Sequence, residues 1–313
     1  MGNHKVLLTD GLEESGQALM GQSLAVDDRT GISAEDLLQI VGDYDALIVR
    51  GRTKVNAAVF AAGKNLKVVG RAGVGVDNID LAAAKAAGVT VVNSPLATTV
   101  AVAELTLGMM LALVREIPRA DHSMKDGKWL KKEFEGSELN GKTLGIIGMG
   151  RIGASVGARA AAFGMKLLGY DPLIPADEIK SRGAEPVSLD ELYRQSDMIT
   201  LHIPLTAESK NLLNAGSFEK MKKGVLVVCA ARGGVIDEEA LLAALNSGQV
   251  AGAALDVFSV EPPGLTDLVK HPKVIAIPHI GAQTMEAQGR AANDISTEIL
   301  RALNNEPLRW KVA

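Results

Sequence analysis

The chain has 313 residues, which exceeds what one hydrophobic core usually holds, so two domains are expected. Hydrophobic residues make up 47% of the chain and the formal net charge is −4, which is typical of a soluble globular protein. No strongly basic surface is indicated, and this argues against nucleic acid as the main partner.

The single cysteine, Cys229, excludes an internal disulfide, and its apolar surroundings favour a buried, unreactive thiol in a reducing compartment. The N-terminal sequence MGNHKVLLTD has no apolar signal core. The most apolar helix candidate, Val100–Val114, is too short to span a bilayer and carries Glu104. We therefore expect a cytoplasmic protein without membrane contact.

The first third of the chain alternates short apolar strands with helices, a rhythm typical of a parallel α/β sheet. Strands are predicted at Lys5–Asp10, Ala46–Arg50, Leu66–Gly73 and Val89–Asn93, and helices at segments such as Ala34–Val41 and Leu81–Ala87.

The third predicted strand runs into GRAGVGVDNID, where Gly73 and Gly75 lack a third glycine at dinucleotide spacing. This turn is either a mononucleotide site or a tight turn whose amides hold a small carboxylate. Cationic side chains gather at the same strand ends: Arg50, Arg52, Lys54 and Arg71. They are either an anion site or ordinary surface charge.

A long apolar helix is predicted from Thr98 or Thr99 to about Ile117, before Pro118. It is apolar on more than one side, which fits either interdomain core or half of a dimer contact. The polar stretch Asp121–Asn140 is interpreted as a linker.

The strongest motif begins with the buried strand Leu144–Ile147 and the turn GMGRIG, Gly148–Gly153. An alanine-rich helix follows to about Phe163, and a second strand, Lys166–Tyr170, leads to Asp171. Gly148 permits the tight turn, Gly150 the approach of a pyrophosphate, and Gly153 close packing of helix on strand. Asp171 can accept hydrogen bonds from a ribose 2′-hydroxyl and repels a 2′-phosphate, which predicts NAD rather than NADP.

Four more strands follow, at Asp197–Thr206, Gly224–Gly234, Val250–Phe258 and Val274–Ala282. Ligands collect at the carboxyl ends of such strands, where His202, Arg232, Asp256 and His279 stand. The last helix, Glu286–Leu303, is predicted to return to the first domain. The expected domains are residues 1–95 with 285–313, and residues 96–284.

A dehydrogenase needs an acid/base group, and histidine suits it. Of the five histidines, His202 and His279 end strands, and spacing separates these two poorly. Glu261 lies on a neighbouring turn, where a carboxylate can orient an imidazole, and Arg232 offers a planar fork for a carboxylate or carbonyl oxygen.

Four motifs together resemble the D-isomer-specific 2-hydroxyacid dehydrogenase family. They are GMGRIG with Asp171, CAARGGVID (Cys229–Asp237), ALDVFSVEPP (Ala254–Pro263) and PHIGAQT (Pro278–Thr284). GRAGVGVDNID and GKWLKKEFEGSELNGKTLGIIG (Gly127–Gly148) are most similar to the branch that oxidises 3-phospho-D-glycerate to 3-phosphohydroxypyruvate with NAD, in serine biosynthesis. The resemblance implies a Rossmann-type NAD domain, a flavodoxin-like substrate domain and a cleft between them. It also implies a homodimer or higher homo-oligomer, and no metal is expected. Because the chain stops at Ala313, we expect a short form without a C-terminal regulatory domain.

The resemblance also implies roles for single residues. Arg232 binds the substrate's carboxylate and C2 oxygen, His279 is the acid/base, and Glu261 orients it. The implied cofactor site comprises Gly148, Gly150, Arg151, Ile152, Gly153, Asp171, Ile203, Ala230, Arg232, Asp256, His279 and Gly281. The implied substrate site comprises Arg50, Arg71, Gly73, Val74, Arg232 and His279. Whether Lys131 or Lys132 contacts the substrate is left open.

Six positions depart from the common pattern. Cys229 replaces Asn, Val74 and Ile203 replace Thr, and a Gly-Asn-Ser type loop is replaced by Ala97, Thr98 and Thr99. These departures leave the NAD site intact but leave the exact substrate open. A glyoxylate or hydroxypyruvate reductase of the same family therefore stays as an alternative, one with less use for the cationic cluster. An NAD-sensing binding protein of the same fold is the alternative from another class.

Overall fold

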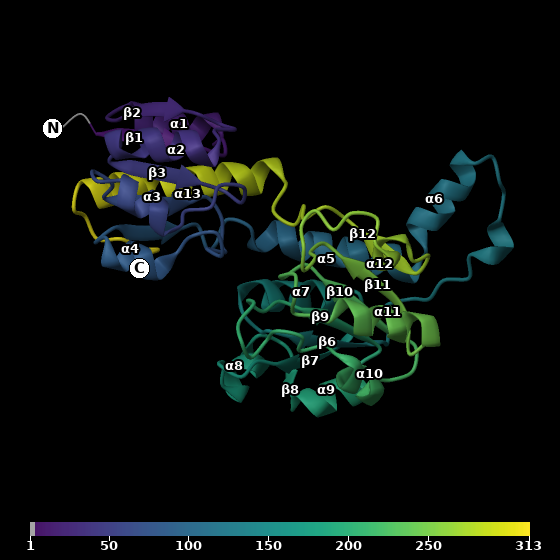
Figure 1. Ribbon diagram of the computed structural model, residues 1–313. Coiled ribbons are helices and arrows are strands. Elements are labelled where there is room, and N and C mark those ends of the chain that lie inside the picture. Colours follow the sequence, from purple (N-terminus) through teal and green to yellow (C-terminus); the bar gives the residue numbers. More distant parts are fainter. Residues whose placement is uncertain (1–3) are drawn as a thin grey trace. The chain divides into compact units, whose positions relative to one another are not determined.

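A computed structural model describes residues 4–313 and divides the chain into two compact units. The first runs up to Thr98 and includes Ala282–Ala313, and the second is Thr99–Gly281. Each is a parallel sheet covered by helices on both faces (Figure 1). The predicted fold class of two doubly wound α/β domains is confirmed.

The first unit has a five-stranded sheet in the order β2-β1-β3-β4-β5, the flavodoxin-like arrangement. Its strands are β1 (Lys5–Leu8), β2 (Ala25–Asp28), β3 (Ala46–Val49), β4 (Val68–Arg71) and β5 (Thr90–Asn93). β2, at the sheet edge, was not predicted, because two of its four residues, Asp27 and Asp28, are acidic and it has no apolar run.

Successive residues of these strands alternate between two hydrophobic cores, as the strand period requires. Leu7 and Leu47 face one core and Val6 and Ile48 the other. The first core is closed by α2 (Ala34–Ile40), α3 (Ala57–Ala62) and α4 (Leu81–Ala86), with the 3₁₀ turn η1 (Val41–Asp43). The second is closed by α1 (Glu14–Gly21) and α13 (Met285–Leu303).

α13 packs against α1 at very short range. A Cβ placed at Gly16 would lie 2.8 Å from the Ala292 carbonyl oxygen, and the Ser296 hydroxyl donates to the Gly16 carbonyl oxygen at 3.0 Å. The missing side chain at Gly16 therefore lets the C-terminal helix complete the core of the N-terminal sheet.

The second unit has a seven-stranded sheet in the order β12-β11-β10-β9-β6-β7-β8. All its pairs are parallel, and the order reverses direction at β6, as in dinucleotide-binding folds. The strands are β6 (Thr143–Ile147), β7 (Lys166–Tyr170), β8 (Glu185–Pro186), β9 (Met198–Leu201), β10 (Val225–Cys229), β11 (Val250–Leu255) and β12 (Val274–Ala276).

One face of this sheet is covered by α5 (Thr99–Val114) and α7 (Arg151–Ala162). The opposite face is covered by α9 (Leu189–Gln195), α10 (Ala215–Lys220) and α11 (Glu238–Ser247). α8 (Ala176–Ser181) and α12 (Asp267–Lys270) are short connections. Met110 of α5 is fully buried, so the apolar helix belongs to the core of this unit itself.

The predicted end of that helix was wrong. α5 stops at Val114, because Glu116 adopts a left-handed φ of 51°. A separate helix, α6 (Ile117–Lys125), then begins with Pro118 in its first turn, where proline is tolerated. The stretch interpreted as a linker is therefore partly helical, and it also holds the 3₁₀ turn η2 (Lys131–Glu133).

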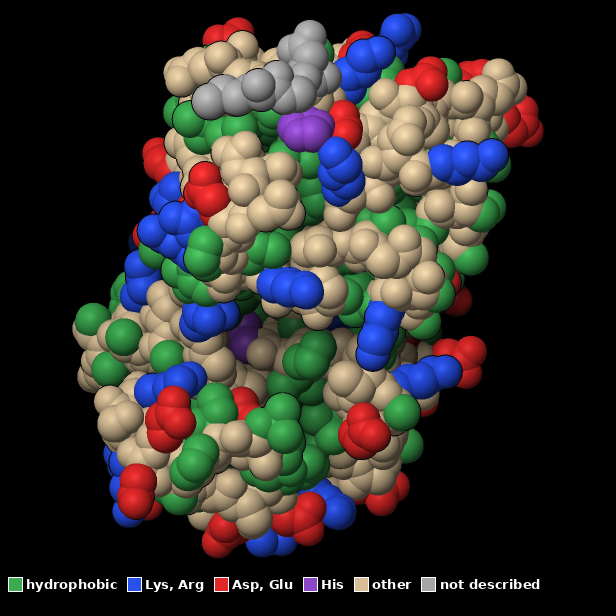
Figure 2. Space-filling model, turned by 90° about the vertical axis from the view of Figure 1, so that its left-hand side faces the viewer, with side chains coloured by type: hydrophobic (Ala, Val, Ile, Leu, Met, Phe, Trp, Pro, Cys, Tyr) green, Lys and Arg blue, Asp and Glu red, His purple; other side chains and the backbone are tan. Residues whose placement is uncertain are grey.

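Within residues 4–313, no helix is both long and apolar enough to cross a bilayer. On the face shown in Figure 2, Lys and Arg side chains are interspersed with acidic and uncharged ones rather than gathered in one basic patch.

Candidate active site

The glycine turn after β6 has the backbone that its sequence requires. Gly148 has a φ of 94°, and a Cβ there would lie 2.5 Å from the His202 carbonyl oxygen. A Cβ at Gly153 would lie 2.0 Å from the Gly148 carbonyl oxygen, so α7 can pack this closely only with glycine there. Gly150, the N-cap of α7, faces open space and presents no side chain to it.

Asp171 directly follows β7 and lies beside this turn. Its Oδ2 accepts the Met149 amide at 2.9 Å, and its Oδ1 accepts the Leu173 amide at 2.9 Å. Arg151 and Ile152 form the first turn of α7, and the Ile203 side chain lies against Gly148. A glycine turn, a helix N-terminus and an acid thus meet at one sheet edge, which fits the pyrophosphate and ribose of a dinucleotide.

His279 and Glu261 form a close pair at the same edge of this sheet. The distance between His279 Nδ1 and Glu261 Oε2 is 2.8 Å, and the imidazole side chain is 51% exposed. Glu261 Oε1 also accepts the Phe258 amide at 3.1 Å, which fixes the carboxylate. His279 has a φ of 50°, a left-handed conformation that costs a non-glycine residue energy and is common at functional sites.

Asp256 holds the loop that carries His279. Its carboxylate is 1% exposed and accepts the amides of Ile280 at 2.7 Å and Gly281 at 2.8 Å. Burial raises the pKa of Asp256, and these two amides oppose that rise. A Cβ at Gly281 would lie 3.0 Å from Asp256 Oδ2, so glycine there makes room for the carboxylate.

Arg232 lies in the loop after β10, half-buried, with Nη1 donating to the Ala231 carbonyl oxygen at 2.7 Å. A Cβ at Gly233 would lie 1.8 Å from the Phe258 carbonyl oxygen, so the Arg232 loop directly touches the segment that positions Glu261. Burial raises the pKa of the Cys229 thiol to about 11, although the amides of Ala231 and Arg232 lower it. The thiol is therefore neutral and unreactive at physiological pH.

The structure separates the two candidate histidines. Burial lowers the pKa of His202 to about 3, so its ring is neutral at physiological pH. Its Nε2 lies 3.1 Å from the Thr200 hydroxyl, and its Nδ1 has no hydrogen-bond partner among the described residues. His279, with a carboxylate partner and an exposed ring, is the one suited to proton transfer.

In the first unit, the predicted substrate residues gather where β3 and β4 end. A Cβ at Gly73 would lie 1.4 Å from Arg71 Nη1, so the guanidinium occupies the space beside this glycine, and the Val74 carbonyl oxygen accepts Asn93 Nδ2 at 2.7 Å. Arg50 Nη1 lies 3.3 Å from Glu13 Oε1. Arg52 donates to the carbonyl oxygens of Thr9 and Ile32 and pairs with Asp10, so its guanidinium is bound within its own domain.

Two contacts at this edge were missed by the sequence analysis. Glu238 Oε1 accepts the Ser259 amide at 2.6 Å and so tethers the segment before Glu261. Arg182 donates to the Met149 carbonyl oxygen within the glycine turn. No sequence signal links either side chain to its partner, because both contacts join loops that meet only in the folded sheet.

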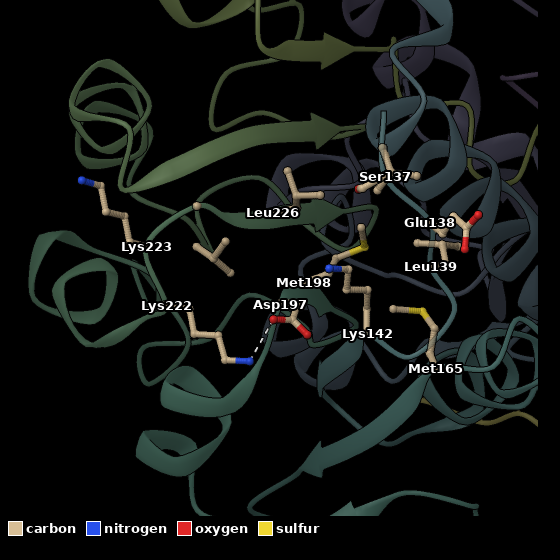
Figure 3. Close-up of a pocket in the computed structure, with 13 residues that line it drawn as sticks. Ser137, Glu138, Leu139, Lys142, Met165, Asp197, Met198, Lys222, Lys223 and Leu226 are labelled. Carbon is tan, nitrogen blue, oxygen red and sulfur yellow. Dashed lines mark hydrogen bonds and ion pairs between the residues drawn. The ribbon is translucent and has the colours of Figure 1, made fainter. Parts of the chain in front are cut away.

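A cavity of about 260 Å³ lies at the opposite edge of this sheet, where Lys142, Met165 and Asp197 precede strands (Figure 3). Lys222 Nζ pairs there with Asp197 Oδ1 at 2.8 Å. None of the predicted site residues lines this cavity, so the site is not located there. Within residues 4–313, no cluster of His, Cys, Asp and Glu could hold a metal ion.

Comparison with known families identifies the second unit. The family model described as "D-isomer specific 2-hydroxyacid dehydrogenase, NAD binding domain" matches residues 107–281, more than half of the chain. The chain belongs to the D-isomer-specific 2-hydroxyacid dehydrogenase family. The predicted family and the predicted NAD cofactor are therefore confirmed.

Curated relatives share much of the sequence. The chain is 49% identical over 97% of its length to D-3-phosphoglycerate dehydrogenase of Rattus norvegicus, and 47% identical over 96% to that of Methanocaldococcus jannaschii. It spans only 57% and 58% of those relatives' own lengths.

Solved structures share the fold over the whole chain. A glyoxylate reductase from Paecilomyes thermophila has a TM-score of 0.92 at 31% identity, covering 100% of this chain and 99% of that one. A D-lactate dehydrogenase from Aquifex aeolicus, complexed with NAD and lactic acid, has a TM-score of 0.84 at 30% identity, covering 96% of each chain.

Proposed function

We propose that this chain oxidises 3-phospho-D-glycerate at C2 with NAD, giving 3-phosphohydroxypyruvate, the step that opens serine biosynthesis. The observation that carries the proposal is the identity of 47–49% to proteins named D-3-phosphoglycerate dehydrogenase, against 30–31% to the glyoxylate reductase and the lactate dehydrogenase.

In the proposed reaction, His279 is the proton acceptor. With its Nδ1 proton directed at Glu261, the ring leaves Nε2 to take the proton from the C2 hydroxyl. The Glu261 carboxylate fixes that tautomer and stabilises the imidazolium that forms. In the reverse direction the same Nε2 returns the proton to the carbonyl oxygen.

The C2–H bond breaks at the same time, and its electron pair leaves as hydride; bound NAD supplies the acceptor for it. Arg232 would hold the substrate's carboxylate and C2 oxygen with its planar fork, which places C2 for transfer. Asp256 keeps the His279 loop in place through the amides of Ile280 and Gly281. Arg50, Arg71, Gly73 and Val74 are the further residues that we propose for substrate binding.

The test is NADH oxidation by purified protein with 3-phosphohydroxypyruvate, hydroxypyruvate, glyoxylate and pyruvate side by side. We expect kcat/KM for the phosphorylated acid to exceed the others by about a hundredfold or more, because a site built for a charged group rejects analogues that lack it. Equal or better turnover of the unphosphorylated acids would contradict the proposal.

A glyoxylate or hydroxypyruvate reductase is the second candidate, and one observation favours it. Arg52 is bound to carbonyl oxygens and to Asp10 of its own domain, so this guanidinium of the cationic cluster is already occupied and is less suited to a substrate phosphate. The same substrate panel separates the two functions.

We also propose a homodimer located in the cytoplasm. The dimer is supported by apolar side chains exposed on the stretch after α5, of which Trp129 is 77% exposed. Light scattering on the purified protein and fractionation of the source cell would test these two proposals.

A further inference from the structure

The Met149 residue of the glycine turn is held from two sides by opposite charges. Its amide donates to Asp171 Oδ2 at 2.9 Å, and its carbonyl oxygen accepts a hydrogen bond from Arg182 Nη1. Asp171 and the Arg182 guanidinium therefore lie on either side of a single residue.

Arg182 is held in this place by a second contact. Its Nη2 pairs with Glu178 Oε1 at 2.5 Å, one turn earlier along α8. The Arg182 side chain keeps 28% of its surface exposed, and that of Glu178 keeps 48%. A guanidinium has five N–H donors, so one carbonyl oxygen and one carboxylate oxygen leave it donors for a further anion.

These contacts place a cation beside the ribose end of the dinucleotide site. Asp171 is the acid that holds ribose hydroxyls in such folds, and its negative charge repels a 2′-phosphate. Arginine beside the ribose is the group that accepts a 2′-phosphate, by charge and by its planar fork. In this chain the carboxylate that favours NAD and a guanidinium that suits the 2′-phosphate of NADP are both hydrogen-bonded to the same residue of the glycine turn.

We propose that Arg182 is a latent 2′-phosphate anchor, kept silent by the charge of Asp171 and by the ion pair with Glu178. Cofactor choice then depends on three residues, and the loss of the Asp171 charge alone lets Arg182 bind the phosphate of NADP. The proposal rests on the dinucleotide site and not on the identity of the substrate.

The experiment is calorimetric titration with 2′,5′-ADP and 5′-AMP, the adenosine halves of NADP and NAD. We expect Asp171→Ser to bind 2′,5′-ADP, and Asp171→Ser/Arg182→Met to bind it about tenfold more weakly, the usual size of one charged hydrogen bond. 5′-AMP affinity should change less than about twofold between these two variants, because AMP has no 2′-phosphate.

Lys180→Met in the Asp171→Ser background is the matched control. It removes one positive charge from the same short helix, at an exposed position, and should leave the 2′,5′-ADP affinity unchanged. Asp171→Ser/Glu178→Gln should bind 2′,5′-ADP more tightly than Asp171→Ser, since the guanidinium is released.

Equal binding of 2′,5′-ADP by Asp171→Ser and Asp171→Ser/Arg182→Met would overturn the proposal. An equal loss for both nucleotides would also overturn it, because it would mean that Arg182 only shapes the turn. If Asp171→Ser does not fold, Asp171→Asn with and without Arg182→Met provides the same comparison, and equal binding of 2′,5′-ADP by those two variants contradicts the anchor. The titration needs no substrate, so a failed substrate panel leaves this test intact.

Discussion

Glu261 and His279 are the side chains on which the proposed chemistry depends, and the 2.8 Å contact between them defines their separate tasks. Glu261→Gln keeps a hydrogen-bonding side chain but removes the charge that stabilises the imidazolium. We expect kcat for 3-phosphohydroxypyruvate reduction to fall by about a hundredfold, the size of a general acid/base contribution, with little change in KM for NADH.

Glu239→Gln is the control for that experiment, since Glu239 is exposed at the start of α11 and is not assigned to the site. A Glu261→Gln enzyme with the wild-type kcat would show that the pair does not carry the proton transfer.

The buried His202 leads to a prediction about the pH dependence of folding stability rather than about catalysis. Burial lowers its pKa from 6.5 to about 3, so the unfolded chain takes up a proton at a pH where the native ring stays neutral. Stability is therefore lost as pH falls through 6.5 toward 3. This one group should cost about 2 kcal/mol between pH 7 and pH 5.

Urea unfolding at pH 7, 6 and 5 measures this effect. The free energy of unfolding should drop less with acidification in His202→Gln than in wild type, and His122→Gln in exposed α6 controls for the loss of a histidine as such. Parallel pH profiles for wild type and His202→Gln would contradict the buried neutral ring.

At the scale of elements, the loop after β10 and the loop after β11 touch through their backbones. A Cβ at Gly233 would lie 1.8 Å from the Phe258 carbonyl oxygen, a distance that no real Cβ tolerates. Gly233→Ala must therefore push apart the loops of Arg232 and Glu261. We expect a loss of about 2 kcal/mol in stability and at least about tenfold in kcat/KM.

The same substitution at Gly289 is the matched control. Gly289 lies within α13 and faces open space, so alanine there should stabilise the protein by about 0.5–1 kcal/mol through helix propensity. Thermal unfolding of both variants should show a loss of stability for Gly233→Ala and a gain for Gly289→Ala. A Gly233→Ala protein as stable and active as wild type would contradict the contact between the loops.

At the scale of the whole molecule, the proposed dimer can be tested by substituting the exposed Trp129. A side chain of that size, 77% exposed, is costly in water unless a partner covers it. Trp129→Glu should shift the mass measured by light scattering from dimer toward monomer, with Lys128→Glu as the control for added negative charge. A wild-type protein that is monomeric at assay concentration would already contradict the dimer.

The sequence predicted the glycine turn well because each glycine there answers a local backbone requirement. The φ of 94° at Gly148 and the tight packing at Gly153 follow from residues a few positions apart. It predicted the C-terminal end of α5 poorly, because the residue with the left-handed conformation there is Glu116 and not the glycine or asparagine that usually marks a helix end. β2 was missed because an edge strand with two acids lacks the apolar pattern of a buried one.

By itself, the sequence determined the fold class, the family and the NAD cofactor, because strand periodicity, glycine spacing and the acid at the end of a strand are all local patterns. The family resemblance already favoured His279, but only the tertiary structure shows that His202 is buried and that His279 has a carboxylate partner, because these contacts arise from elements far apart in the chain. The same holds for Asp256, Glu238 and Arg182, whose hydrogen-bond partners lie in loops that only the folded sheet brings together.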